Sequence, residues 1–171
     1  EVHCSGMAKG ERYQKMNETN NRHDALGTLF IIRGLAGSGK STLAKMIAPT
    51  CRFEADDFFY DAGYDSGSKY NFDHTKLGEA HAYCEQGVIK AMRNRNPIVA
   101  VANTFSTRWE IQKYLDYAND AGYTVQIIEC QGSYGSVHDV PKDVIQRMKD
   151  RWDKIELVKC GSWNALRDVY E

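Results

Sequence analysis

The stretch from Thr28 to Ser41 constrains the fold more than any other part of this sequence. An apolar run, residues 28–32, leads directly into Gly34-Leu35-Ala36-Gly37-Ser38-Gly39-Lys40-Ser41. Short β-branched and aromatic runs are typical of buried parallel strands. The second segment matches G-x-x-x-x-G-K-S in full. A helix is expected over residues 40–47, ended by Pro49. The order of strand, glycine-rich loop and helix predicts a phosphate-binding loop.

The residue types in this loop suit a nucleoside triphosphate. Glycines let the backbone curl until successive N–H groups point inward, and the helix that follows adds its positive end. Lys40 is expected to contact the β- and γ-phosphates of ATP, and the Ser41 hydroxyl to ligate Mg²⁺. Thr42 either supports the first helical turn or contacts the α-phosphate. The predicted nucleotide-binding residues are Gly34, Ala36, Gly37, Ser38, Gly39, Lys40, Ser41 and Thr42.

Two alternatives to this interpretation have different weight. A glycine-rich turn that merely caps a helix does not need the complete motif between a strand and a helix, so we set it aside. Whether the nucleotide serves phosphoryl transfer or a conformational switch is not decided by the loop.

The rest of the chain alternates between strand and helix patterns. Further strands are expected over residues 52–54, 97–102 and 124–129. Helices are expected after Asp73, after a capping box formed by Thr107 and Glu110, and after Pro141 with its apolar residues facing inward. This alternation predicts an α/β fold of the P-loop NTPase type, with a parallel sheet of four to five strands and helices on both faces.

Length and composition set limits on the domain count and on the partners. A chain of 171 residues that is 42% hydrophobic can form one sizeable core. We expect residues 1–27 to be a flexible N-terminal segment, whose origin lies in processing or cloning, and 28–171 to be one folded domain. A net charge of -1 provides no broad attraction to nucleic acid or to an anionic membrane, so any polyanion contact needs a local patch.

The cysteines and the absence of long apolar runs indicate where in the cell this protein is expected to occur. The five cysteines are widely spread and odd in number, which favours reduced thiols over a disulfide framework. No apolar run is long enough to cross a bilayer or to form a signal peptide. We therefore expect a cytoplasmic protein without a membrane partner.

Two aspartates follow the second expected strand, on the same side of the sheet as the loop. A kinase that phosphorylates a hydroxyl benefits from a carboxylate that accepts the proton. Adjacent residues of an extended chain point to opposite faces, so one of the pair is expected to reach the acceptor. We favour Asp56 as general base and metal ligand, and place Asp57 on the substrate side, where it caps a turn or assists the metal shell. The alternative is a pair of solvated turn aspartates.

The strand expected over 97–102 ends without a carboxylate. Many P-loop proteins carry an aspartate here that holds the metal through water, but this chain has Ala102-Asn103-Thr104. Asn103 can hydrogen-bond a metal-bound water, a nucleophile or a ribose, but it cannot act as a base. This favours a kinase that depends on Asp56 over a water-activating ATPase.

These residues occur in an order that resembles the polynucleotide-kinase branch of P-loop kinases, particularly small ATP-binding proteins of bacteria and their phages. The resemblance covers residues 29–153 and implies that Asp56 is the general base for a nucleic-acid 5′-hydroxyl, while Lys40 and Ser41 hold ATP and magnesium. The matching blocks are residues 33–42, Ala55-Asp56-Asp57-Phe58-Phe59, Tyr70-Asn71-Phe72-Asp73, Ala80-His81, Ala102-Asn103-Thr104, Trp109-Glu110 and Val137-His138-Asp139-Val140-Pro141.

The chain departs from that family pattern in its lid. The family usually carries a lid arginine before the Val-Pro segment, whereas residues 130–136 are short, glycine-rich and free of arginine. Such an arginine stabilises charge on the transferred phosphoryl group. Arg108 and Arg147, with Arg151 as a third candidate, are the possible replacements, although a solvated helix charge is the more common role of such arginines.

Other residues are candidates for contact with the acceptor. Arg108, Trp109 and His138 are expected on the substrate side together with Asp57 and Asn103, and Tyr70 and Phe72 are able to stack a base. His81 is expected to be a core histidine.

The sequence therefore favours a kinase that phosphorylates a hydroxyl of nucleic acid, most of all a polynucleotide 5′-hydroxyl. Three alternatives stay open: a kinase of hydroxymethylated bases extruded from DNA, a nucleoside or small-molecule kinase, and a nucleotide-binding module without an acceptor. No pattern indicates an oligomeric state.

Overall fold

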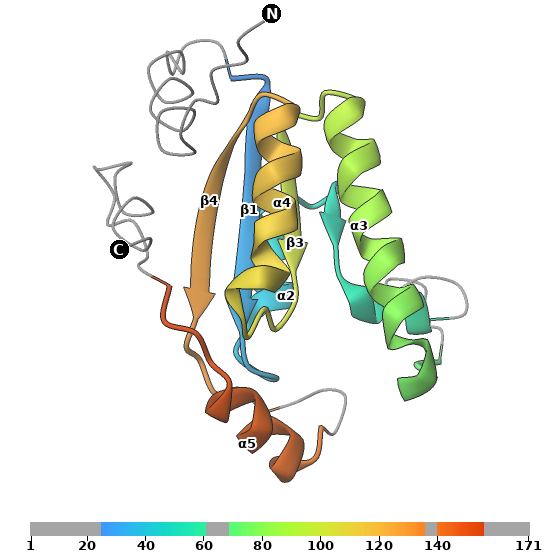
Figure 1. Cartoon of the computed structure of the whole chain (residues 1–171). Helices are drawn as coiled ribbons and strands as arrows, with labels where there is room; N and C mark the ends of the chain where they lie inside the picture. Colours follow the sequence, from blue (N-terminus) through green and yellow to red (C-terminus); the bar gives the residue numbers. More distant parts are fainter. Residues whose placement is uncertain (1–24, 61–68, 136–139, 156–171) are drawn as a thin grey trace, which may run out of the picture.

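A parallel sheet forms the centre of the computed structural model, which describes residues 25–60, 69–135 and 140–155 (Figure 1). Its strands are β1 (Gly27–Gly34), β2 (Arg52–Phe53), β3 (Ile98–Ala102) and β4 (Tyr123–Cys130), in the order β2-β3-β1-β4. Strand β1 pairs in parallel with both β3 and β4, and β2 pairs in parallel with β3. The expected α/β fold with a parallel sheet is confirmed, with four strands among the described residues.

Alternate side chains of the central strands supply two apolar layers. Leu29 and Ile31 of β1 pack in one cluster with side chains of α3 (Leu77–Arg93) and α4 (Arg108–Asp120). Ile32 packs in a second cluster with Ala44 of α2 (Lys40–Ile47). This alternation follows from the two-residue period of a strand. Helices therefore cover both faces of the sheet, as expected, and α4 crosses β1 and β3 on one of them (Figure 1).

Local signals set where the helices begin. The capping box before α4 is present, because the Thr107 backbone N–H donates to the Glu110 carboxylate at 2.9 Å. Asp73 accepts the Thr75 N–H at 2.9 Å and opens a short 3₁₀ turn, η3 (His74–Lys76), that continues into α3. The sequence also allows a last short helix, capped by Ser162 and containing Trp163, and this stretch lies outside the described residues.

Of two expectations about packing, one holds only in part and the other is wrong. No residue of α5 (Lys142–Asp150) is buried, although its apolar side was expected to face inward. The helix lies beyond the carboxyl ends of the strands instead of on a face of the sheet, so its apolar side is only partly covered (Figure 1). His81 is exposed on α3 and is not a core histidine, since the buried stripe of that helix runs through Ala80, Cys84 and Val88.

Within residues 25–60, 69–135 and 140–155, every helix is too short or too polar to span a lipid bilayer.

Candidate active site

Three segments leave the carboxyl ends of neighbouring strands at one edge of the sheet. β1 continues into the glycine-rich loop and α2, β2 continues into the 3₁₀ turn η1 (Ala55–Phe59), and β3 ends next to Asn103. Because parallel strands end on the same side, these segments lie together, and ligands of open α/β sheets bind at such an edge (Figure 1).

The loop needs glycine where it turns away from β1. A Cβ at Gly34 would lie 2.3 Å from the Ser38 hydroxyl oxygen and 2.7 Å from the Cys130 carbonyl oxygen. Gly39, which precedes α2, has φ 93 and lies in the left-handed region. Two backbone bonds hold the loop: Gly34 N–H donates to the Thr104 carbonyl at 3.3 Å, and Tyr134 N–H donates to the Gly37 carbonyl at 2.9 Å. The loop is therefore tightly curled and tied to its neighbours.

Polar groups of the loop fit a triphosphate. The Ser38 hydroxyl is buried and has no hydrogen-bond partner among the described residues. The Lys40 ammonium reaches back across the loop and donates to the Leu35 carbonyl at 2.8 Å. Burial lowers the pKa of Lys40, and the nearby carboxylates of Glu54 and Asp56 oppose this shift. A glycine cradle, an unpaired hydroxyl and a bent-back ammonium are the groups that phosphate oxygens require.

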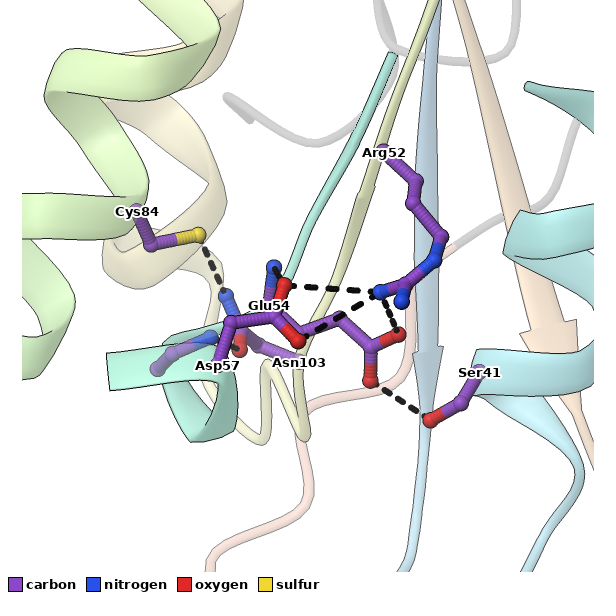
Figure 2. Close-up of polar contacts among 7 residues, drawn as sticks. Ser41, Arg52, Glu54, Asp57, Cys84 and Asn103 are labelled. Atoms are coloured by element: carbon purple, nitrogen blue, oxygen red, sulfur yellow. Dashed lines mark hydrogen bonds and ion pairs between the residues drawn. The ribbon is translucent and has the colours of Figure 1, made fainter. Parts of the chain in front are cut away.

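A buried carboxylate that the sequence analysis did not single out contacts the loop (Figure 2). The Ser41 hydroxyl donates to Glu54 Oε2 at 2.5 Å, and Arg52 Nη1 donates to Glu54 Oε1 at 3.0 Å. Glu54 is only 6% exposed. Burial raises the pKa of Glu54 to about 7, while the Ser41 hydroxyl and Arg52 act in the opposite direction. The available signal was an acidic residue at the end of the expected strand, two positions before Asp56.

The acidic pair does not lie on extended chain, so that premise of the sequence analysis is wrong. Asp56 and Asp57 belong to η1, whose 3₁₀ geometry rotates successive side chains by a third of a turn. Asp57 Oδ2 accepts the Glu54 backbone N–H at 3.3 Å and an Arg52 N–H at 3.4 Å, so Asp57 caps the turn as expected. Asp56 points elsewhere: its Oδ1 accepts the Tyr70 hydroxyl at 3.0 Å.

Aromatic rings pack against the ring of Tyr70, whose hydroxyl donates to Asp56. Tyr70 packs edge-on against Phe59 with ring centroids 6.1 Å apart and stacks on Phe72 at 6.3 Å. Phe72 is 52% exposed. Burial, followed by the Asp56 carboxylate, raises the pKa of Tyr70, so the phenol keeps its proton and stays a donor to Asp56.

Both the oxygen and the nitrogen of the Asn103 side-chain amide are hydrogen-bonded within the protein (Figure 2). Its Oδ1 accepts the Ala55 backbone N–H at 2.9 Å, and its Nδ2 donates to Cys84 Sγ at 3.5 Å. Asn103 is 9% exposed. The residue therefore ties the end of β3 to η1 and α3, and its predicted contact with substrate stays a prediction.

The candidate arginines contact other parts of the chain. Arg108 donates from Nη2 to the Lys154 carbonyl at 3.0 Å, and Arg151 donates from Nε to the Ser106 hydroxyl at 2.8 Å. Arg147 pairs with Asp143 on the exposed surface of α5 at 2.9 Å. None of these contacts involves the loop. Trp109 is 73% exposed beside Arg108. His138 lies outside the described residues.

A different arginine lies directly before the loop. Arg33 is fully buried, and its guanidinium carbon is 4.1 Å from the centroid of the Trp152 ring. Its Nη1 donates to the Asp153 carbonyl at 3.0 Å and lies 3.7 Å from Glu129 Oε2. Burial lowers the pKa of Arg33, whereas Glu129 and Asp153 oppose the shift. These contacts fasten the segment after α5 to the end of β1.

A magnesium ion would find few protein ligands here. Across residues 25–60, 69–135 and 140–155, no group of three or more His, Cys, Asp or Glu side chains is arranged to hold a metal. The Ser41 hydroxyl next to a carboxylate does fit a hard cation that takes most of its ligands from phosphate and water.

Comparisons with known proteins agree with this architecture. The model of a family described as AAA domain matches residues 29–135. NEDD4-binding protein 2 of Homo sapiens is 28% identical over an alignment of 139 residues that covers 74% of this chain, and the chain spans 8% of that protein's length.

Solved structures are similar in fold. A chain in the structure of a Pnkp1/Rnl/Hen1 complex has a TM-score of 0.50 at 20% identity, covering 85% of this chain and 46% of that one. A gluconokinase from Sinorhizobium meliloti has a TM-score of 0.47 at 16% identity, covering 77% of this chain and 78% of that one. At such identities the likeness concerns the fold alone.

Proposed function

This chain belongs to the AAA domain family, and from that premise we propose that it is an ATP-dependent kinase for a hydroxyl of nucleic acid, with a polynucleotide 5′-hydroxyl as acceptor. The chain is a P-loop kinase-like domain in fold. The observation that carries the proposal is the position of Asp56 beside the loop: η1, which bears Asp56, begins directly after Glu54, and Glu54 Oε2 accepts the Ser41 hydroxyl at 2.5 Å. The Asp56 carboxylate also opposes the lowering of the Lys40 pKa. A phosphate-binding lysine and a carboxylate at one edge are what transfer to a hydroxyl needs.

In the proposed reaction the loop binds ATP. The backbone N–H groups of the loop and the Lys40 ammonium contact the phosphates, and the Leu35 carbonyl releases Lys40 for this purpose. Ser41 and Asp56 would help to hold a magnesium ion, which would supply positive charge to neutralise the β- and γ-phosphates. Because the loop is already curled and tied by backbone bonds, it requires little rearrangement to bind.

Asp56 is proposed to orient the acceptor and to take its proton. Tyr70 donates to Oδ1 and fixes the side-chain rotamer, so the carboxylate is held toward one direction. The proton of the acceptor hydroxyl passes to the Asp56 carboxylate as the hydroxyl oxygen bonds to the γ-phosphorus, and ADP leaves. Asp57, which is engaged by Arg52 and the Glu54 backbone, supports η1.

The choice of nucleic acid as acceptor rests on the sequence resemblance and on the aromatic rings beside Asp56. Phe72 is 52% exposed and stacks on Tyr70, which is bonded to Asp56. Exposed rings next to a base-catalyst suit the stacking of a terminal nucleobase, an interaction that tolerates any sequence. The near-neutral net charge favours short contacts at an end over a long electrostatic groove.

The experiment is a transfer assay with γ-labelled ATP. The acceptor panel contains 5′-hydroxyl DNA and RNA, the same strands with 5′-phosphates, DNA with hydroxymethylated bases, free nucleosides and sugars. We expect label on the 5′-hydroxyl strands and none on the 5′-phosphorylated ones. Label on modified bases or on monomers would replace the proposed acceptor, and label on no acceptor would leave a nucleotide-binding module.

Two variants test the assigned residues. Lys40→Ala and Asp56→Asn should each lower transfer by at least about 100-fold, and Asp56→Asn should leave metal-free ADP binding, measured in EDTA, unchanged. Asp116→Asn, an exposed aspartate of α4, is the matched control and should keep full activity. Normal turnover in Asp56→Asn would exclude it as the base.

A further inference from the structure

The contact between Ser41 and Glu54 has no role in the mechanism described so far. Glu54 is a buried carboxylate, and burying such a group without strong compensation is costly. Each oxygen of the Glu54 carboxylate accepts a hydrogen bond that offsets this cost: Oε1 accepts from Arg52 at 3.0 Å, and Oε2 accepts from the Ser41 hydroxyl at 2.5 Å (Figure 2). One oxygen is thus committed to an ion pair, and the other is aimed at the loop.

The bond determines how the Ser41 hydroxyl is oriented. A serine hydroxyl has one proton to donate and two lone pairs that accept or ligate. Because the proton is directed to Glu54 Oε2, the lone pairs of Ser41 Oγ must point away from Glu54. A hydroxyl fixed in this way is ready to offer a lone pair to a cation, and outer-sphere carboxylates commonly orient metal ligands by such bonds.

Glu54 also supplies a negative charge near a strand end, that of β3, which has no carboxylate of its own. The end of β3 carries the neutral Asn103, whose amide is already bonded to Ala55 and Cys84. Glu54 stands at the end of the neighbouring strand β2 and interacts electrostatically with Lys40. A second negative charge beside Asp56 therefore reaches the loop from β2 and not from β3.

We propose that Glu54 is a positioning residue for the magnesium ion of the nucleotide site, acting through the Ser41 hydroxyl and supplying the carboxylate that the end of β3 lacks. The inference rests on the proposed ATP–magnesium function of the loop, but it does not depend on which molecule accepts the phosphate.

Measurements of metal and nucleotide binding test the proposed role of Glu54 without any phosphate acceptor. The probes are ADP with Mn²⁺, followed by the electron paramagnetic resonance signal of free Mn²⁺, and ADP alone in EDTA, followed by calorimetry. Glu54→Gln keeps the shape and removes the charge. We expect it to weaken Mn²⁺ binding to the ADP complex by about 10-fold to 100-fold and to leave ADP affinity in EDTA the same or tighter.

A double-mutant cycle separates this role from a general effect on charge or folding. Because Glu54 is proposed to act through Ser41, Glu54→Gln in a Ser41→Ala background should cost no further Mn²⁺ affinity. Glu129→Gln is the matched control, since Glu129 also pairs with a buried arginine at a strand end but does not contact Ser41, and it should bind Mn²⁺ as the wild type does.

Several results would overturn the proposal. They are unchanged Mn²⁺ affinity in Glu54→Gln, an equal loss in Glu129→Gln, or additive losses in the double variant. If Glu54→Gln fails to fold, Glu54→Asp provides the second measurement: withdrawing the carboxylate by one methylene should still weaken Mn²⁺ binding severalfold, and wild-type affinity there would equally reject the role. A protein that binds Mn²⁺–ADP as expected but phosphorylates no nucleic acid would refute only the proposed acceptor.

Discussion

Replacing Asn103 with alanine tests whether this residue contacts substrate or links β3 to η1 and α3 through its hydrogen bonds. Asn103 Oδ1 is the acceptor for the Ala55 backbone N–H at 2.9 Å, and Ala55 is 7% exposed. Without it, a buried N–H is left unpaired, which costs about 1–3 kcal/mol. The weak bond from Nδ2 to Cys84 Sγ and the small space left by the amide add to this loss. We expect Asn103→Ala to lower the free energy of unfolding by about 2 kcal/mol.

The assay is urea unfolding followed by far-UV circular dichroism, with the slope of the transition checked for constancy. A loss of about 2 kcal/mol corresponds to a fall in melting temperature of roughly 4–8 °C for a domain of this size. Because Ala55 opens η1, which carries Asp56, we also expect a lower kcat for phosphoryl transfer with little change in nucleotide affinity.

Asn96→Ala is the matched control for this variant. It removes the same kind of amide, but the Ala91 carbonyl that Asn96 Nδ2 contacts keeps its bond from the Asn96 backbone N–H at 3.2 Å. We expect it to cost less than about 1 kcal/mol. If Asn103→Ala is no less stable than Asn96→Ala and yet loses transfer activity, the hydrogen bonds of Asn103 contribute little to stability. Asn103 then contacts substrate, as the sequence alone suggested.

Three further predictions concern the loop, its buried carboxylate and its arginine. Gly34→Ala places a methyl group 2.3 Å from the Ser38 hydroxyl oxygen, so calorimetry should detect a loss of ADP binding, whereas Gly78→Ala, with no atom within 4 Å, should bind normally. Burial raises the pKa of Glu54 from 4.5 to about 7, and the charged groups near it are Lys40, Arg52, Asp56 and Asp57. Between these two pH values the folded protein holds a proton on Glu54 that the unfolded chain has lost. The metal-free protein should therefore lose up to about 3 kcal/mol of this contribution as pH rises from about 4.5 to above 7, and urea unfolding at a series of pH values should find a flatter profile in Glu54→Gln. Trp152→Ala removes the ring over the buried Arg33 guanidinium and should cost about 2 kcal/mol in urea unfolding, whereas Trp109→Ala, at a position 73% exposed, should cost less than about 0.5 kcal/mol.

Local patterns predicted much of the fold because they act over short distances. The helix over 40–47 and the capping box of α4 were correctly located, since a glycine-rich turn and a Thr-x-x-Glu spacing specify their own surroundings. The alternation of strand and helix patterns correctly predicted helices on both faces of the sheet. The inward packing of α5 was predicted from its apolar spacing and holds only in part, because an apolar stripe does not specify what covers it.

The sequence by itself determined the loop, the lysine and serine that end it, and the nearby aspartate. These elements depend on spacing within a few residues, and backbone geometry translates such spacing directly into structure. Only the tertiary structure decided that Glu54 contacts Ser41, that Tyr70 holds Asp56, and that Asn103 joins β3 to η1. These partners are 13, 14 and 48 residues apart in sequence. The first and third pairs meet because parallel strands end at one edge of the sheet, and Tyr70 reaches Asp56 because it forms an antiparallel bridge with Tyr60, directly after η1.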